Sequence, residues 1–234
     1  QGLLAKSIKD YLEQDNYQVD LIVADANDEY LQKAKSIGLK IELCNLGTTV
    51  FPDTDLITMR SVLHYNSLDG QKEILSRVYE SLNPGGFFVN QFTTGSKLAC
   101  EMRSEIINHP LLGRAKYDGQ YKWITVDDEY MEIMKSIGFT SNNLTGYGAT
   151  ISWGPLEQWD RYHGIFLKEA EEQRNTVEVS RLKENRTQYL EESKKIIEKY
   201  LDISTAEELG IHLLPDGNYK IDSVYPIIVS KKLA

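Results

Sequence analysis

The chain of 234 residues is long enough for one large domain, or for a domain that carries a sizeable insertion. Its 35 acidic residues exceed its 26 basic ones, which gives a formal net charge of -9. This charge repels a phosphate backbone, so nucleic acid is excluded as an expected partner. No apolar run reaches the roughly 20 residues that a bilayer crossing needs, and no signal peptide is evident. We therefore expect a cytoplasmic protein without a membrane partner.

The two cysteines, Cys44 and Cys100, lie far apart in the sequence. They show neither the short spacing of metal ligands nor a disulfide framework. We therefore expect two reduced thiols and no metal site.

The first half of the chain alternates short apolar strands with amphipathic helices. Leu4, Ile8 and Leu12 recur every four residues and predict a helix from Leu3 to Glu13. The elements predicted after it are a strand over 20–25, a helix from Asn27 or Asp28 to Gly38, strands over 40–44 and 55–59, a helix over 74–82 and a strand over 87–92. This alternation is typical of βαβ units, so the expected fold is α/β with a doubly wound, mostly parallel sheet.

The second half interrupts this pattern with a charged helical stretch. Thr125 and Asp128 resemble a capping box ahead of a helix that ends at Gly138, and a strand is predicted over 141–147. Residues 155–205 are predicted to form a helical insertion, and a last strand follows over 225–230. The α/β domain would then consist of residues 1–154 and 206–234.

Three segments resemble, in their order and spacing, motifs of the class I S-adenosylmethionine-dependent methyltransferases that act on small molecules. The segment 23–35 (VADANDEYLQKAK) resembles the second motif, in which an acidic residue ends a strand. The segment 55–65 resembles the fourth motif, and 75–89, with its Pro-Gly-Gly turn at 84–86, resembles the helix, turn and fifth strand that follow it. The resemblance implies a Rossmann-like methyltransferase domain whose insertion serves as a lid or as a homodimerisation element.

The start of the chain carries a further expectation. Gln1 to Ala5 resembles the end of the family's glycine loop, with Gly2 as its last glycine. In this family the strand before the loop lies in the middle of the sheet. Without it, each unpaired buried backbone group would cost about 1–3 kcal/mol. We therefore predict that further residues precede Gln1 in the natural protein.

The resemblance also implies which residues hold S-adenosylmethionine, with S-adenosylhomocysteine as the product. A carboxylate at a strand end can accept both hydroxyl protons of a ribose, which is the role implied for Asp25. Asn45 stands where the family has an aspartate, and its carbonyl can accept from the adenine amino group. The implied set is Gly2 and Leu3 at the methionine half, Asp25, Ala26, Asn45 and Leu46 around the ribose and adenine, and Met59 and Arg60 near the methionine part. The alternatives are a turn aspartate at Asp25 and a surface arginine at Arg60.

Two histidines are candidates for a catalytic base. The resemblance places His64 near the departing methyl group, and His163 lies in an aromatic-rich stretch that is the candidate substrate wall. The alternatives are a packed structural histidine at His64 and a solvated helix histidine at His163. The residues predicted to contact the substrate are Tyr65, Tyr147, Trp153 and Tyr162. Trp159 and Tyr162 also fit the apolar stripe of a helix that faces the core.

The sequence favours a small-molecule acceptor. Neither the Asn/Asp-Pro-Pro-Tyr motif nor the Pro-Cys nucleophile of nucleic-acid methyltransferases is present. The expected reaction is an in-line displacement in which the protein mainly positions the acceptor. Two other functions stay open: a methyltransferase-like binding or assembly module without catalysis, and a nicotinamide dehydrogenase, which shares the glycine loop and Asp25.

Overall fold

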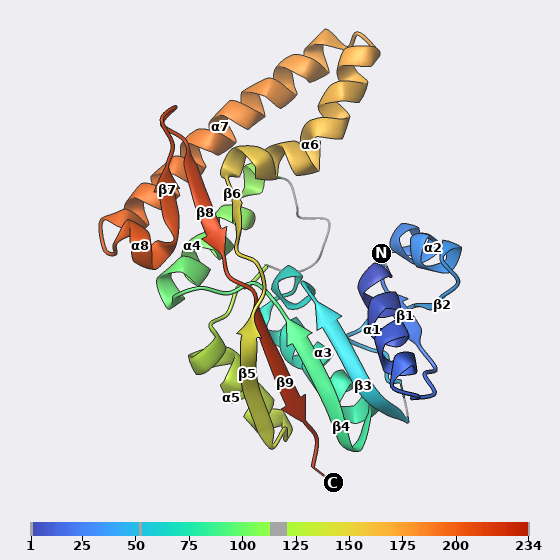
Figure 1. Cartoon of the computed structure of the whole chain (residues 1–234). Coiled ribbons are helices and arrows are strands. Elements are labelled where there is room, and N and C mark those ends of the chain that lie inside the picture. Colours follow the sequence, from blue (N-terminus) through green and yellow to red (C-terminus); the bar gives the residue numbers. More distant parts are fainter. Residues whose placement is uncertain (1, 52, 113–120, 234) are drawn as a thin grey trace.

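The computed structural model describes residues 2–51, 53–112 and 121–233. Its larger sheet has the strand order β3-β4-β9-β5. The strands are β3 (Thr54–Arg60), β4 (Leu82–Gln91), β9 (Pro226–Lys231) and β5 (Ser141–Tyr147). β4 runs parallel to β3, whereas β9 runs antiparallel to both β4 and β5. The predicted α/β fold class is confirmed, but the larger sheet is mixed, with one parallel and two antiparallel pairs, where the sequence predicts a mostly parallel sheet (Figure 1).

The N-terminal elements form a separate pair of parallel strands with two helices. They are α1 (Leu3–Gln14), β1 (Ile22–Asp25), α2 (Asp28–Ser36) and β2 (Lys40–Leu43). The side chain of Asn27 caps α2 by accepting from the Glu29 amide, as the sequence predicts. Within the described residues, β1 and β3 are not hydrogen-bonded to each other. Gln1 lies outside the described residues, and the prediction that further residues precede it stays a prediction.

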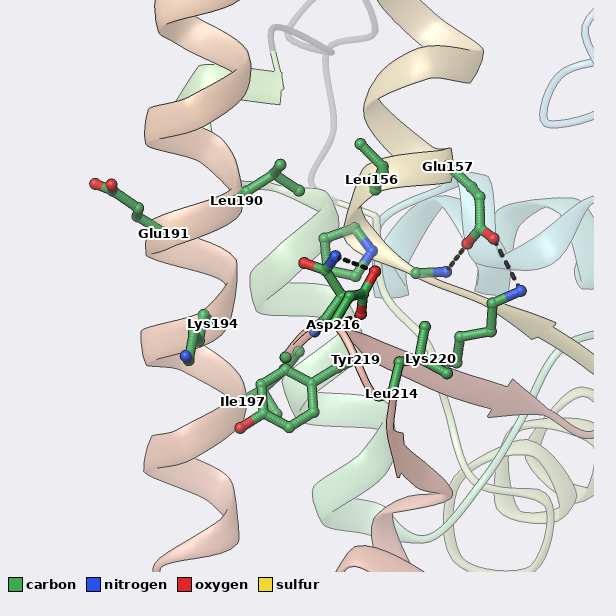
Figure 2. A pocket seen from close by; sticks show the side chains of 14 residues that line it. Leu156, Glu157, Leu190, Glu191, Lys194, Ile197, Leu214, Asp216, Tyr219 and Lys220 are labelled. Atoms are coloured by element: carbon green, nitrogen blue, oxygen red, sulfur yellow. Dashed lines mark hydrogen bonds and ion pairs between the residues drawn. The ribbon is translucent and has the colours of Figure 1, made fainter.

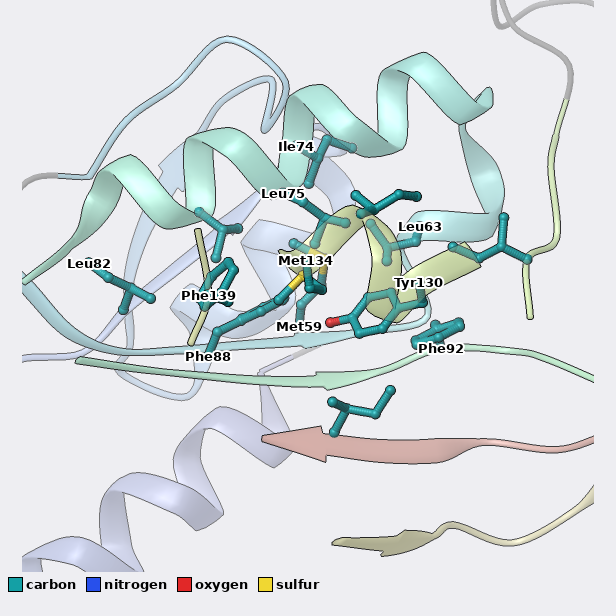
Figure 3. Close-up of a cluster of buried hydrophobic side chains, with 14 residues drawn as sticks. Met59, Leu63, Ile74, Leu75, Leu82, Phe88, Phe92, Tyr130, Met134 and Phe139 are labelled. Atoms are coloured by element: carbon teal, nitrogen blue, oxygen red, sulfur yellow. The ribbon is translucent and has the colours of Figure 1, made fainter. Parts of the chain in front are cut away.

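The first hydrophobic core lies between one face of the larger sheet and two helices, α3 (Leu68–Ser81) and α5 (Met131–Ile137) (Figure 3). Apolar residues recur every three or four positions along α3, which turns Ile74 and Leu75 toward the sheet. From the strand side Phe88 points into this core and is fully buried. Successive strand residues point to opposite faces, so its neighbour Phe87 remains 43% exposed.

The turn that precedes α5 differs from the predicted capping box. A π-helical turn over Val126–Tyr130 comes before α5. The carboxylate of Glu129 accepts from the Thr125 amide at 2.8 Å, so Glu129 takes the role predicted for Asp128. A π-helical turn holds an extra residue, which moves the acidic partner one position along the chain.

Gly138 ends α5 in a left-handed conformation with φ 116°. A Cβ at this position would lie 3.1 Å from the hydroxyl oxygen of Tyr79. Backbone strain and this contact together lead us to expect that Gly138→Ala lowers the free energy of unfolding by about 1–3 kcal/mol in urea titrations. Gly164→Ala is the control, because a Cβ there meets nothing within 4 Å. If both variants shift stability in the same direction, the local cause is wrong.

A second unit packs beside the larger sheet. It contains an antiparallel sheet in the order β6-β8-β7. Its elements are α4 (Lys97–Ile107), β6 (Ile151–Trp153), α6 (Pro155–Glu172), α7 (Thr176–Leu201), α8 (Ala206–Leu209), β7 (Ile211–Leu213) and β8 (Tyr219–Ser223). Figure 1 shows α6 and α7 as a long hairpin that projects away from the larger sheet.

The second unit has its own hydrophobic core. Trp159 of α6 and Tyr189 of α7 are buried there, with their ring centroids 5.7 Å apart. Residues of α4, α8, β7 and β8 join the same core, so apolar packing ties the α6–α7 hairpin to segments before and after it. The division of the chain at residues 155 and 205 stays a prediction.

Candidate functional site

Two polar side chains stand where β1 and β2 end. Asp25 ends β1, and its Oδ1 accepts from the Asn27 amide at 2.8 Å, which fixes the carboxylate at the turn. Asn45 follows β2, and its Oδ1 accepts from the Gly47 amide at 2.9 Å. The Cys44 amide donates to the Asp25 carbonyl oxygen at 3.1 Å and ties the two strand ends together. The structure therefore brings Asp25 and Asn45 to the same edge of this small sheet.

Cys44 lies beside these groups and is not a nucleophile at neutral pH. Partial burial raises the pKa of its thiol, and the carboxylates of Glu42 and Asp25 add to that rise. The thiol therefore stays protonated, and only the thiolate is an effective nucleophile. The prediction of unpaired cysteines holds for this structure.

The turn after β2 also reaches the first core. Leu46 packs against that core, of which Met59 is a buried member on β3. An added Cβ at Gly47 would lie 4.0 Å from Cγ1 of Ile74 on α3. Two predicted cofactor residues, Leu46 in the turn after β2 and Met59 on β3, thus share one apolar environment.

Gly2 and Leu3 occupy different surroundings. Gly2 is buried with φ 82°, and an added Cβ would lie 2.9 Å from Cβ of Ala34 on α2. This close approach to α2 gives a physical reason for glycine. Leu3 is 67% exposed, and Ala26, directly after Asp25, is exposed as well.

The carboxyl end of β3 has a strained backbone. Arg60 ends the strand with an exposed side chain. Ser61 follows with φ 55°, an uncommon value for a residue with a side chain, and its amide donates to the Gln91 carbonyl oxygen at 2.7 Å. Such strain is concentrated at functional sites. The chain then forms a short 3₁₀ helix, η1 (Leu63–Tyr65), which carries His64.

His64 is buried, with 9% of its surface exposed. Its Nδ1 lies 3.4 Å from the hydroxyl oxygen of Thr93, a residue that follows β4. The carboxyl ends of β3 and β4 therefore meet at this imidazole. Parallel strands place their ligand-binding groups at this end of a sheet.

His64 belongs to an aromatic cluster, whose other members are Tyr65, Tyr121, Trp123 and Trp153. The ring centroids of His64 and Tyr65 are 4.2 Å apart, and the edge-on rings of His64 and Trp123 are 5.8 Å apart. Trp123 contacts Trp153 at 5.8 Å, and Tyr65 contacts Tyr121 at 5.7 Å. Two predicted substrate residues, Tyr65 and Trp153, therefore join the same cluster as His64.

Sequence reasoning missed Thr93, Tyr121 and Trp123. Tyr121 and Trp123 precede the helix predicted from Thr125, and an aromatic pair in that apolar run was the available signal. Thr93 gave no signal, because its role depends on the pairing of β3 with β4.

The other predicted catalytic and substrate residues lie elsewhere. His163 stacks on Trp159 in the second core, and its Nε2 lies 2.6 Å from the Leu112 carbonyl oxygen. Tyr162 packs against the same core. Tyr147 ends β5 and is 60% exposed. Neither His163 nor Tyr147 belongs to the aromatic cluster around His64.

Among the described residues, one cavity lies in the second unit and another at its border. One, of about 470 Å³, lies between α6, α7 and the turn that joins β7 to β8. Figure 2 shows Lys220 and Glu157 in its wall, paired at 2.9 Å. The other, of about 670 Å³, lies between α4, α7 and the start of α3, with Tyr121 in its wall. Asp25 and Arg60 line neither of these two cavities.

The described residues offer no metal-binding cluster and no helix that could cross a membrane. No group of three or more His, Cys, Asp or Glu side chains among them is arranged to hold a metal ion. No helix in the same part of the chain has the length and apolar character that crossing a bilayer requires.

Comparison with known proteins defines the fold. No protein-family model and no curated protein matches the sequence. The structure of the YcgJ protein of Bacillus subtilis resembles this one with a TM-score of 0.57 and 16% sequence identity, over 91% of this chain and 82% of that chain. A candidate methyltransferase of Bacillus halodurans resembles it with a TM-score of 0.57 and 12% identity, over 91% of this chain and 83% of that chain. The chain therefore has the Rossmann-like fold of class I methyltransferases.

Proposed function

We propose that this protein transfers a methyl group from S-adenosylmethionine to a small-molecule acceptor. The observation that carries the proposal is the placement of Asp25 and the Arg60–His64 segment at the carboxyl ends of β1 and β3 in a methyltransferase-type fold. Ligands of such sheets bind beyond these strand ends. We further propose that the protein forms a homodimer through the α6–α7 hairpin. We also propose that it is cytoplasmic and has no nucleic-acid partner.

The residues at the strand ends fit the cofactor chemically. The Asp25 carboxylate accepts one hydrogen bond, from the Asn27 amide, and an ionised carboxylate has about four acceptor positions. It can therefore also accept from a ribose diol. The Asn45 carbonyl accepts from the Gly47 amide, so its amide group is the better candidate for pairing with an adenine nitrogen. This differs from the predicted role of its carbonyl as acceptor from the adenine amino group.

Methyl transfer asks little of the protein beyond position. Bound S-adenosylmethionine supplies an electrophilic methyl group on a sulfonium that is a good leaving group. The aromatic cluster would hold the acceptor, and rings of this kind favour flat apolar or cationic groups. A neutral His64 imidazole can take the proton that an O–H or N–H acceptor loses, and Thr93 orients the ring through Nδ1.

Calorimetry with S-adenosylhomocysteine tests the proposal directly. We expect saturable heat with one site per chain for S-adenosylhomocysteine and none for NADH. Incubation with S-adenosylmethionine and a panel of phenols, aromatic amines and thiols should then release S-adenosylhomocysteine for at least one acceptor class. Binding without turnover across the panel would support the catalytically inactive binding module, and heat with NADH alone would support the dehydrogenase.

A further inference from the structure

Arg103 is a buried cation close to the His64 site. It lies on α4 and is 2% exposed. One terminal nitrogen, Nη1, donates to the Thr94 carbonyl oxygen at 2.7 Å, and Nη2 donates to the Asp222 carbonyl oxygen. Its guanidinium carbon lies 5.1 Å from the ring centroid of Trp123, a cation–π contact. The side chain thus joins three segments that are far apart in the sequence.

The surroundings of Arg103 are unusual for a buried charge. Its hydrogen bonds go to backbone carbonyls, and its Nε has no hydrogen-bond partner among the described residues. Burial lowers the pKa of Arg103 to about 10, while the nearby Cys100, Asp222 and Tyr225 oppose this fall. The guanidinium therefore stays protonated at neutral pH, although burying a charge without an ion pair is costly. A function beyond stability would explain why an arginine occupies this place.

The contacts of Arg103 lead to two of the residues around His64, Thr93 and Trp123. Thr94 follows Thr93, whose hydroxyl oxygen meets Nδ1 of His64. Thr94 is itself held by its amide, which donates to the Val224 carbonyl oxygen at 3.0 Å, and by its hydroxyl, which donates to the Ile124 carbonyl oxygen at 2.8 Å. The ring under the guanidinium is Trp123, which meets His64 edge-on. If the guanidinium were displaced, the Thr94 carbonyl oxygen would lose a hydrogen bond and the Trp123 ring would lose its cation–π contact.

We propose that Arg103 is a positioning residue that holds Thr93 and Trp123 against His64 and so sets the orientation of this imidazole toward the methyl acceptor. The catalytic meaning of this orientation rests on the proposed methyltransferase function. The positioning itself is a property of the folded chain and is measurable without any cofactor.

Gly95 offers a second way to move the guanidinium. An added Cβ at Gly95 would lie 2.7 Å from Nη1 of Arg103 and 3.2 Å from Cβ of Ala99. The arginine end is flexible, so Gly95→Ala should displace the guanidinium while keeping its charge and leaving the backbone in an ordinary conformation. Arg103→Lys also keeps the charge, but lysine lacks the planar fork that reaches two carbonyl oxygens.

Long-range ¹H–¹⁵N NMR of the histidine rings in the full chain without cofactor tests the proposal. The sequence has four histidines, and His64→Gln assigns the His64 signals. We expect the His64 ring signals to shift or broaden in both Arg103→Lys and Gly95→Ala, while those of His163 in the second core stay in place. The matched controls are Arg181→Lys on the surface of α7 and Gly164→Ala on α6, where an added Cβ meets nothing within 4 Å. Both controls should leave the His64 signals unchanged.

The outcomes separate positioning from a purely structural role. If both variants melt at lower temperature but their His64 signals match the wild type, Arg103 only stabilises the fold and the proposal is wrong. Should Arg103→Lys fail to fold, Gly95→Ala decides alone. Titration with S-adenosylhomocysteine should give the same Kd within about twofold in Gly95→Ala, because the Asp25 region is untouched. A wild-type chain that binds no S-adenosylhomocysteine would refute the proposed function and still leave the NMR result decisive for Arg103.

Discussion

Asp25→Ala should raise the Kd for S-adenosylhomocysteine by about 100-fold, with little change in melting temperature. Each hydrogen bond to a charged group contributes about 1.5–3 kcal/mol, and a difference of 1.4 kcal/mol changes a binding constant tenfold. The carboxylate can accept from both ribose hydroxyls, whereas in the protein it makes a short-range bond to the Asn27 amide. Asp25→Asn keeps the oxygen for that turn and loses the charge, so its Kd should fall between those of the wild type and the alanine variant. Titration calorimetry measures all three constants.

Asp20→Asn is the control for this measurement. Asp20 precedes the same strand at its other end and pairs with Lys40 at an exposed position. We expect its Kd to match the wild type, because exposed ion pairs contribute at most about 1 kcal/mol to stability and none to this site. An unchanged Kd in Asp25→Ala would remove the ribose role of Asp25 and leave it a turn aspartate.

Phe88→Ala should lower the free energy of unfolding by about 3–5 kcal/mol. Phe88 is fully buried between β4 and the helices of the first core, and its ring lies 6.2 Å from that of Phe139. Truncation removes the transfer free energy of the ring and leaves a cavity in a closely packed core. Since whole domains are stable by about 5–15 kcal/mol, this loss is a large fraction of the total. Urea or guanidinium titrations followed by circular dichroism give the value.

Phe87→Ala is a matched control on the neighbouring residue. Phe87 is 43% exposed on the opposite face of β4, where the Lys231 ammonium lies 5.3 Å from its ring centroid. Losing partial burial and an exposed cation–π contact should cost about 1 kcal/mol or less. Comparable losses in the two variants would mean that the burial of Phe88 in the first core is wrong.

The sequence anticipates the elements whose signals are local. The Asn27 cap and the apolar periodicity of α2 act within a few residues, and β5 spans the predicted residues 141–147. α3 begins at Leu68, earlier than predicted, because Ser67 caps a first turn that lies before the apolar stripe. α4 was missed, since its buried face includes Arg103 and its charges hide the periodicity. The three short strands of the second sheet depend on pairing with one another, which no local pattern reports.

In the candidate site too, residues with local sequence signals were predicted and residues brought in by long-range pairing were missed. Asp25 and His64 came from ordered motifs, and the structure places each of them at a strand end or just beyond one. The groups around His64 come from residues that lie about 30 to 60 positions further along the chain, at Thr93 and Trp123. Such contacts exist only after the sheet has formed. His163 differs, because it is half-buried, stacks on Trp159 of the second core and lies outside the cluster around His64.

The second sheet and the α6–α7 hairpin lie between β5 and β9 in the sequence, and these two strands are neighbours in the larger sheet. β5 and β9 pair antiparallel, and just beyond their ends the Gly148 amide donates to the Tyr225 carbonyl oxygen at 2.7 Å. The chain between these two residues thus leaves and rejoins the larger sheet at one two-stranded stem, and the second core also packs it against α4. Closing a chain across such a stem costs little more for a long loop than for a short one. The length of the α6–α7 hairpin can therefore change without altering the order of the strands in the larger sheet, provided that the contacts with α4 in the second core are kept.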